Sequence, residues 1–211
     1  MALTIYGDSL DGKRHEEILS SVLEFLKERL NTLLSAEGYR YDSARAVLAT
    51  GLDDPYDAFL RVTALERFRQ RPEFESLIIS FKRVMNIIPP DFIGEVREGE
   101  LREREEKDLY SSYREIKDKA LQQRAQHDYE NAFASVAELK PKVDLFFDKV
   151  LVMDKDMNLR NNRLSLLNEM KGLFLELADF TQIVVEGENT NPPYSPFTKG
   201  GNRGIKREIA G

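Results

Sequence analysis

Residues 158–184, NLRNNRLSLLNEMKGLFLELADFTQIV, decide the fold class. Apolar residues recur through this stretch at three- and four-residue steps, which is the period of an amphipathic α-helix. The stretch therefore predicts a long final helix that buries one face and begins with a cluster of Asn and Arg side chains. Its apolar stripe comprises Leu159, Leu166, Leu167, Met170, Leu173, Phe174, Leu177 and Phe180.

The same helical period runs through most of the preceding chain. It predicts a helix from Glu16 to a stop at Gly38 and a short helix that ends at Gly51. Two more helices are separated at Arg71–Pro72, because proline disfavours helical geometry in the residue before it. Further helices are predicted over residues 108–139 and from residue 141, and no segment has the alternation of a strand. The fold class is therefore predicted to be all-α.

The composition limits the function classes. The 211 residues are 41% hydrophobic and 32% charged, with a net charge of −6, so a basic, general nucleic-acid binder is not indicated. A small specific site stays possible, since charges act over a Debye length of about 8 Å. There is no cysteine, which excludes disulfides, thiolate catalysis and cysteine-bound zinc.

Catalytic and membrane signals are missing from the sequence. His15 and His127 are far apart and lack the spacing of a metal site or triad, and no phosphate-cradling glycine motif occurs. No apolar run approaches the roughly 20 residues of a membrane span, and no signal peptide is evident. We therefore expect no catalytic residue, no metal site and no membrane partner, and a cytoplasmic location.

The chain divides into three parts by composition. Residues 1–15 are predicted to be a poorly structured start or the cut edge of a larger chain, and residues 16–185 a helical domain. Residues 186–211 are rich in Gly, Pro and Asn, which predicts a flexible tail. Within the domain, charges alternate in sign over residues 102–108, which is typical of a solvated loop or helix face.

Two segments carry a family resemblance. Residues 57–87, DAFLRVTALERFRQRPEFESLIISFKRVMNI, precede residues 143–183, which begin VDLFFDKVLVMDKDMNLRNNR and end with LFLELADFTQI. Their order and gaps resemble the C-terminal region of the β subunit of bacterial glycyl-tRNA synthetase, and the resemblance covers roughly residues 16–185. The tail after residue 185 departs from that family.

The resemblance implies an anticodon-binding helical bundle, related to those of class I synthetases such as the arginyl enzyme. It implies that the chain is itself non-catalytic and holds no cofactor, while the α subunit uses ATP and Mg²⁺ to join glycine to its tRNA. The implied partners are the anticodon stem-loop of glycine tRNA and, through the full-length β subunit, the α subunit.

Candidate tRNA contacts follow from the chemistry of an unpaired base. The resemblance implies two anticodon cytosines, and a cytosine offers one amino donor beside two acceptors, which an Asn amide can match. Arg adds paired donors for a phosphate. Proteins read unpaired bases by such hydrogen bonds and by stacking. The candidates are Lys82, Arg83 and Asn86 on one helix and Arg160, Asn161, Asn162 and Arg163 at the start of the last.

Structural alternatives are open for the same residues. Asp154, Asp156 or Asn158 can cap the last helix, and Asn162 or Arg163 can brace the bundle. The pair Phe146–Phe147 is interpreted as core, with base stacking as its alternative, and Tyr39 and Tyr41 are further stacking candidates. The rival function is a purely structural domain for subunit assembly. A nucleotide enzyme has only residues 198–204, TKGGNRG, in its favour.

Overall fold

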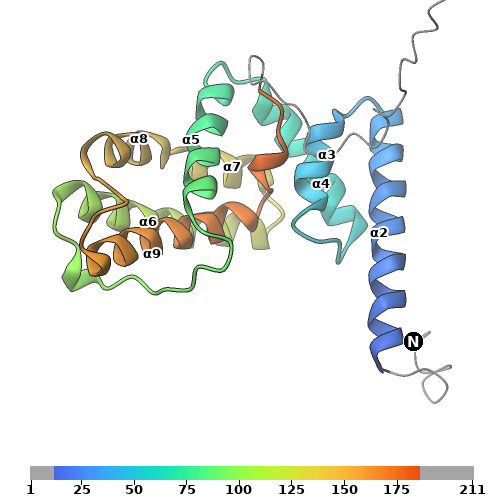
Figure 1. The fold of residues 1–211 in the computed structure, drawn as a ribbon. Helices are drawn as coiled ribbons and strands as arrows, with labels where there is room; N and C mark the ends of the chain where they lie inside the picture. The colour runs from blue at the N-terminus through green and yellow to red at the C-terminus, as the bar shows by residue number, and fades with distance from the viewer. Residues whose placement is uncertain (1–11, 186–211) are drawn as a thin grey trace, which may run out of the picture.

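A computed structural model describes residues 12–185 of the chain (Figure 1). This part is helical and contains no strand, so the predicted all-α class is confirmed. None of its helices combines the length and apolar content needed to cross a bilayer. The tail predicted over residues 186–211 and the first eleven residues lie outside the described residues.

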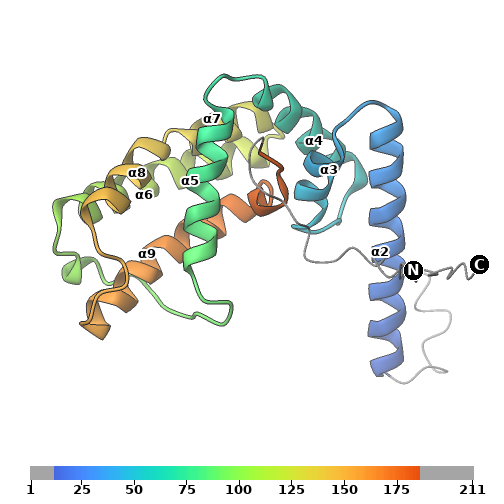
Figure 2. The same cartoon turned by 45° about the horizontal axis from the view of Figure 1, so that its top comes forward.

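The helices form a body with one helix at its edge (Figures 1 and 2). α2 packs against α3, α3 against α4, and α4 against α7, while α6 contacts α7, α8 and α9, and α5 crosses α9. The elements are α2 (Gly12–Ala36), α3 (Tyr41–Leu48), α4 (Pro55–Arg69), α5 (Phe74–Ile87), η1 (Glu98–Glu100), α6 (Arg104–Ala125), α7 (Tyr129–Ala137), α8 (Lys140–Lys149), α9 (Met157–Leu175) and η2 (Phe180–Gln182).

The helix predicted over residues 108–139 is two helices. α6 ends at Ala125, and His127 then adopts a left-handed backbone with φ of 57°. Asp128 begins α7 by accepting a hydrogen bond from the backbone N–H of Asn131. Both helices bury apolar faces in one core, so the helical period continues across the turn and conceals it.

An aromatic cluster forms the centre of the core. The rings of Phe81 on α5 and Phe174 on α9 stack with centroids 4.1 Å apart. Phe180 contacts both of these rings and also Phe133 on α7, which stacks on Phe68 of α4. Each buried ring removes a large apolar area from water and so stabilises the fold. The cluster thus joins four helices and η2.

A buried ion pair ties the start of α9 to the start of α6. The Arg163 guanidinium contacts Glu106, whose side chain is 1% exposed, and also Asp154 at 2.9 Å. Glu106 accepts hydrogen bonds from the backbone N–H groups of Arg102 and Glu103, and so closes a capping box on α6. Burial alone lowers the pKa of Arg163, but the two carboxylates outweigh it and raise that pKa. The charge run over residues 102–108 was predicted to be solvated, and Glu106 is the exception.

Removing one member of this buried pair should destabilise the fold strongly. We expect Arg163→Ala to lower the free energy of unfolding by about 3 kcal/mol or more, because it leaves the Glu106 charge buried and unpaired. Arg160→Ala is the matched control, since Arg160 is half-exposed on the same helix, and its effect should stay within about 0.5 kcal/mol. Urea unfolding followed by circular dichroism measures both, and equal effects would contradict the assignment.

Asp42 fastens the segment after η2 to α3. Its buried carboxylate accepts a hydrogen bond from the Val184 backbone N–H at 2.8 Å and pairs with Arg69 at 2.9 Å. Burial raises the pKa of Asp42, but the Val184 hydrogen bond and the Arg69 charge outweigh burial, and the pKa lies below its usual value.

The lowered pKa predicts a pH dependence of stability. Asp42 stabilises the fold above about pH 4, the pKa of an unfolded Asp, and this contribution is lost as the pH falls toward the folded-state pKa. Asp42→Asn should cost about 2 kcal/mol at pH 7 and flatten the fall in stability below pH 4. Urea unfolding at pH 7, 5 and 3.5 tests this, and parallel pH profiles for the two proteins would contradict it.

Candidate nucleic-acid interface

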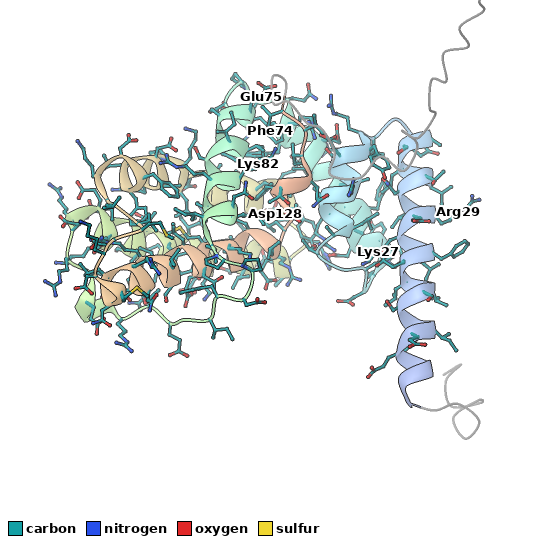
Figure 3. All side chains as sticks on the ribbon, viewed as in Figure 1. Lys27, Arg29, Phe74, Glu75, Lys82 and Asp128 are labelled. Atoms are coloured by element: carbon teal, nitrogen blue, oxygen red, sulfur yellow. The ribbon has the colours of Figure 1, made fainter. Side chains whose placement is uncertain are left out.

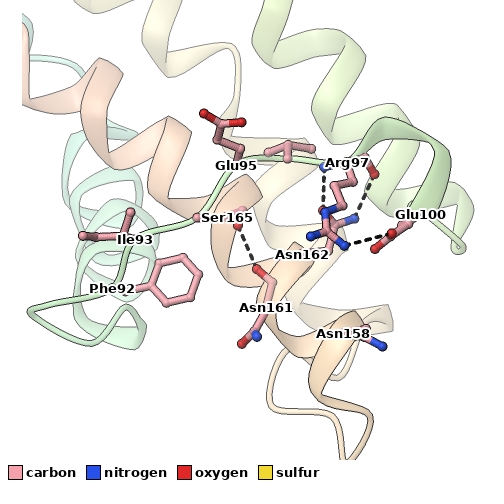
Figure 4. Close-up of a pocket in the computed structure, with 11 residues that line it drawn as sticks. Phe92, Ile93, Glu95, Arg97, Glu100, Asn158, Asn161, Asn162 and Ser165 are labelled. Carbon is pink, nitrogen blue, oxygen red and sulfur yellow. Dashed lines mark hydrogen bonds and ion pairs between the residues drawn. The ribbon is translucent and has the colours of Figure 1, made fainter.

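Residues 92–97 run in an extended conformation along the first half of α9 (Figure 4). Burial alternates along the segment. Phe92, Gly94 and Val96 are half-buried, while the residues between them and Arg97 are exposed, and Ile93 is 95% exposed. This alternation is the two-residue period of a strand-like backbone, although a side chain pairs with it in place of a neighbouring strand.

That side chain is the amide of Asn162. Its Oδ1 accepts a hydrogen bond from the Arg97 backbone N–H at 2.7 Å, and its Nδ2 donates to the Arg97 carbonyl at 3.1 Å. Asn162 is buried. An Asn amide carries both a donor and an acceptor, so it can satisfy one residue's backbone as a neighbouring strand would. Asn162 therefore positions the segment on α9.

Gly94 is the point of closest approach between the segment and the helix. A Cβ at this position would lie 2.4 Å from Ser165 Oγ and 3.0 Å from the Phe92 ring. Ser165 Oγ is held in place because it donates to the Asn161 carbonyl at 2.9 Å. Only glycine lets the segment lie this near α9.

A polar groove lies between the segment and α9. The cavity is about 400 Å³, within the range of small-ligand sites. α9 contributes Asn158, Asn161, Asn162 and Ser165, which are spaced at i, i+3, i+4 and i+7 and so share one helix face. The segment contributes Phe92, Ile93, Gly94, Glu95, Val96 and Arg97, and Glu100 completes the lining.

The groups that the groove presents to a ligand are mainly side-chain amides and an aromatic ring. Asn158 and Asn161 are exposed, and Figure 4 shows the Phe92 ring directed toward Asn161. Arg97 pairs with Glu100 at 3.2 Å. The helix N-terminus is already capped, because Asp156 accepts hydrogen bonds from the backbone N–H groups of Asn158 and Leu159. This chemistry suits a planar, hydrogen-bonding group better than a bare anion.

The four predicted contacts on α9 have different environments. Asn161 is exposed in the groove and Arg160 is half-exposed, whereas Asn162 and Arg163 are buried and bonded within the protein. Sequence reasoning treated Asn158 only as a cap and missed Phe92 and Glu95. The Asn and Ser stripe on one helix face was the available signal.

The predicted contacts on α5 lie apart from the groove. Arg83 places its guanidinium 4.1 Å from the Phe147 ring centroid, Lys82 is half-buried and Asn86 is exposed (Figure 3 labels Lys82). α5 crosses α9 at Phe174, which is about 20 Å along the helix from Asn161 at 1.5 Å per residue. The structure thus does not gather the two groups around one point. Phe146 is buried as predicted, and Phe147 lies beneath Arg83.

The family is decided by comparison with known proteins. Residues 82–186 match the family described as the DALR anticodon binding domain. Over these residues, the chain belongs to that family. The groove lies entirely within the matched residues, and the resemblance seen in the sequence is confirmed at the level of the family. Among the side chains that the structure describes, within residues 16–185, no group of three or more His, Asp or Glu could hold a metal ion.

Curated relatives of the DALR-containing chain agree with this assignment. The glycine–tRNA ligase beta subunit of Sulfurihydrogenibium sp. (strain YO3AOP1) is 43% identical over 165 residues, 78% of this chain and 24% of that protein. The subunit of the same name from Geotalea uraniireducens (strain Rf4) is 39% identical over 178 residues, 82% of this chain and 26% of that protein. The chain therefore spans about a quarter of the length of these relatives.

The packing at Gly94 gives a test of how the groove is built. Gly94→Ala should cost about 1 to 3 kcal/mol, the usual penalty for overfilling a packed site. Ser165→Ala removes the nearest atom, so adding it to Gly94→Ala should restore part of the loss. Thermal unfolding of the single and double variants measures the coupling. Additive effects would show that Gly94 and Ser165 do not meet in solution.

Proposed function

We propose that this chain binds the anticodon stem-loop of glycine tRNA and serves a glycine–tRNA ligase. Membership of an anticodon-binding family and the names of the relatives support the proposal. In it, the chain supplies recognition and no catalytic residue. Activation of glycine with ATP and Mg²⁺ takes place on an α subunit, which the chain reaches through the rest of a β subunit, and the cytoplasm is the expected location.

The groove beside α9 is the observation that carries this proposal. An anticodon loop presents unpaired bases with open hydrogen-bonding edges and faces. The exposed Asn161 amide can donate to a cytosine acceptor and accept from its amino group, and the Phe92 ring supplies an apolar face for stacking. We assign Asn161 to direct base contact, with Asn158 beside it.

The other candidates take different roles in this proposal. Arg160 precedes Asn161 and is half-exposed. Its guanidinium could therefore contact a phosphate next to the bound base. Lys82, Arg83 and Asn86 would contact a more distant part of the stem-loop. Asn162 and Arg163 act indirectly, since they hold the extended segment and the start of α9 in place.

A purely structural role in subunit assembly is the alternative function. The exposed apolar face of α2 favours such a role for that helix. It says nothing against base contact at the groove, because α2 lies at the other edge of the molecule (Figures 1 and 2).

Binding of an RNA hairpin that carries the glycine tRNA anticodon loop tests the proposal. Asn161→Ala should weaken binding about tenfold, because losing a paired amide costs about 1 to 1.5 kcal/mol, and should leave the melting temperature nearly unchanged. Gln122→Ala, an exposed amide near the end of α6, is the matched control and should bind normally. Fluorescence anisotropy at fixed salt measures hairpin binding by the wild type and by both variants.

The hairpin also separates direct from indirect contacts. Asn162→Ala should lose both stability and binding, whereas Asn161→Ala should lose binding alone. A second hairpin with both anticodon cytosines replaced by uracil should bind more weakly to the wild type. Equal binding of the two hairpins, or equal effects of the Asn161 and Gln122 variants, would contradict the proposal.

A further inference from the structure

α2 carries an apolar face that the rest of the described chain leaves uncovered. The helix has 25 residues, yet its contacts with the body lie near its C-terminal end, where Leu34 is buried and Leu30 half-buried against the core. The remainder of α2 stands beside the body (Figures 1 and 2). Seven large apolar side chains on it are each 41% to 65% exposed: Ile18, Leu19, Val22, Leu23, Phe25, Leu26 and Leu33.

These side chains form one contiguous face. At 100° per residue, the arc from Phe25 through Leu26 to Leu23 covers about half of the helix circumference. Arg29 lies within this arc and projects outward, whereas Lys27 lies on the side toward the body (Figure 3). Glu17, Glu24 and Glu28 occupy the opposite, polar side and are exposed. Soluble monomers rarely expose contiguous apolar patches of this extent.

The body does not need this face for its own stability. Its core is closed by the aromatic cluster and the apolar faces of α3 to α9, and residues 16–26 of α2 contribute no buried side chain. The face lies outside residues 82–186, which match the anticodon binding family. The apolar face of α2 is therefore a separate surface from the groove, and we expect it to contact a different partner.

We propose that α2 docks in an apolar groove of the part of a glycine–tRNA ligase beta subunit that lies outside this chain. The matched relatives are about four times as long as the aligned region, so most of the relatives' polypeptide lies outside the part that matches this chain. The inference rests on the ligase assignment of the proposed function, and it does not depend on RNA binding.

The width of the apolar arc selects this partner over a second copy of the chain. A two-helix coiled coil buries a narrow seam of residues repeating every 3.5 positions, which Leu19, Leu23, Leu26 and Leu30 could supply. Ile18 and Phe25 lie well away from that seam, and a two-stranded pairing would leave them exposed. A helix that is apolar over half of its circumference fits a groove between several elements of a larger domain.

Hydrogen exchange of α2 in two contexts tests the proposal. One sample is this chain alone. The other is the Sulfurihydrogenibium beta subunit with its aligned residues replaced by this chain. Amides of residues 16–29 should exchange at least tenfold more slowly in the chimera. The double variant Leu19→Glu with Phe25→Glu should abolish that protection, while Glu28→Gln on the polar side should not.

A second measurement keeps the test decisive if the chimera fails to fold. The chain has no cysteine, so a dye on Phe25→Cys reports association in trans with the Sulfurihydrogenibium subunit from which the aligned residues are deleted. Labelled Arg45→Cys, at an exposed position of the mostly buried α3, is the control, and the chain alone is checked for self-association by light scattering. Equal α2 exchange in both contexts, absence of association in trans, or a dimer that Phe25→Glu dissociates would overturn the proposal. Hairpin binding by the same samples reports separately on the RNA function.

Discussion

The buried contact between Arg163 and Glu106 is the constraint on which the candidate interface depends. Glu106 caps α6 through two backbone N–H groups, and Arg163 joins that cap to α9 and, through Asp154 and the Leu151 carbonyl, to the loop after α8. One turn of α9 therefore has a fixed position relative to the start of α6 and to the loop after α8. Because Asn162 is the adjacent residue, the same constraint fixes the amide that holds the extended segment.

This arrangement explains why neighbouring polar residues on one helix have unlike roles. Arg163 and Asn162 are turned into the protein, and their polar atoms are satisfied there, as buried polar groups require. Asn161 and Asn158 are turned toward the groove. Rigid support from residues next in sequence is what a recognition surface needs, since a base contact works only if its partner is already in position. The buried Asn162 and Arg163 thus hold the exposed Asn158 and Asn161 in position.

The sequence predicts the helices well because their burial is periodic, and it predicts the groove poorly because its key partners are remote. The α9 stripe as far as Phe174, the Pro55 start of α4 and the core position of Phe146 follow from local patterns. The final helix predicted over residues 158–184 ends at Leu175, however, and Leu177 and Phe180 are buried beyond its end. Glu106 lies in a run of alternating charges, and nothing local distinguishes it from its solvated neighbours, since its partner is 57 residues away. Similarly, nothing local in residues 92–97, FIGEVR, predicts a site, and their extended shape depends on Asn162, 65 residues after Arg97.

The central claim is that the groove between residues 92–97 and α9 contacts an unpaired base. Titrating the glycine anticodon hairpin into isotope-labelled protein and following backbone amide resonances tests it directly. The account predicts that the largest shifts fall in residues 92–97 and 157–165, with α2 and α7 unaffected. Shifts confined to α2, α4 or α7, or no shifts at hairpin concentrations that saturate binding, would contradict it.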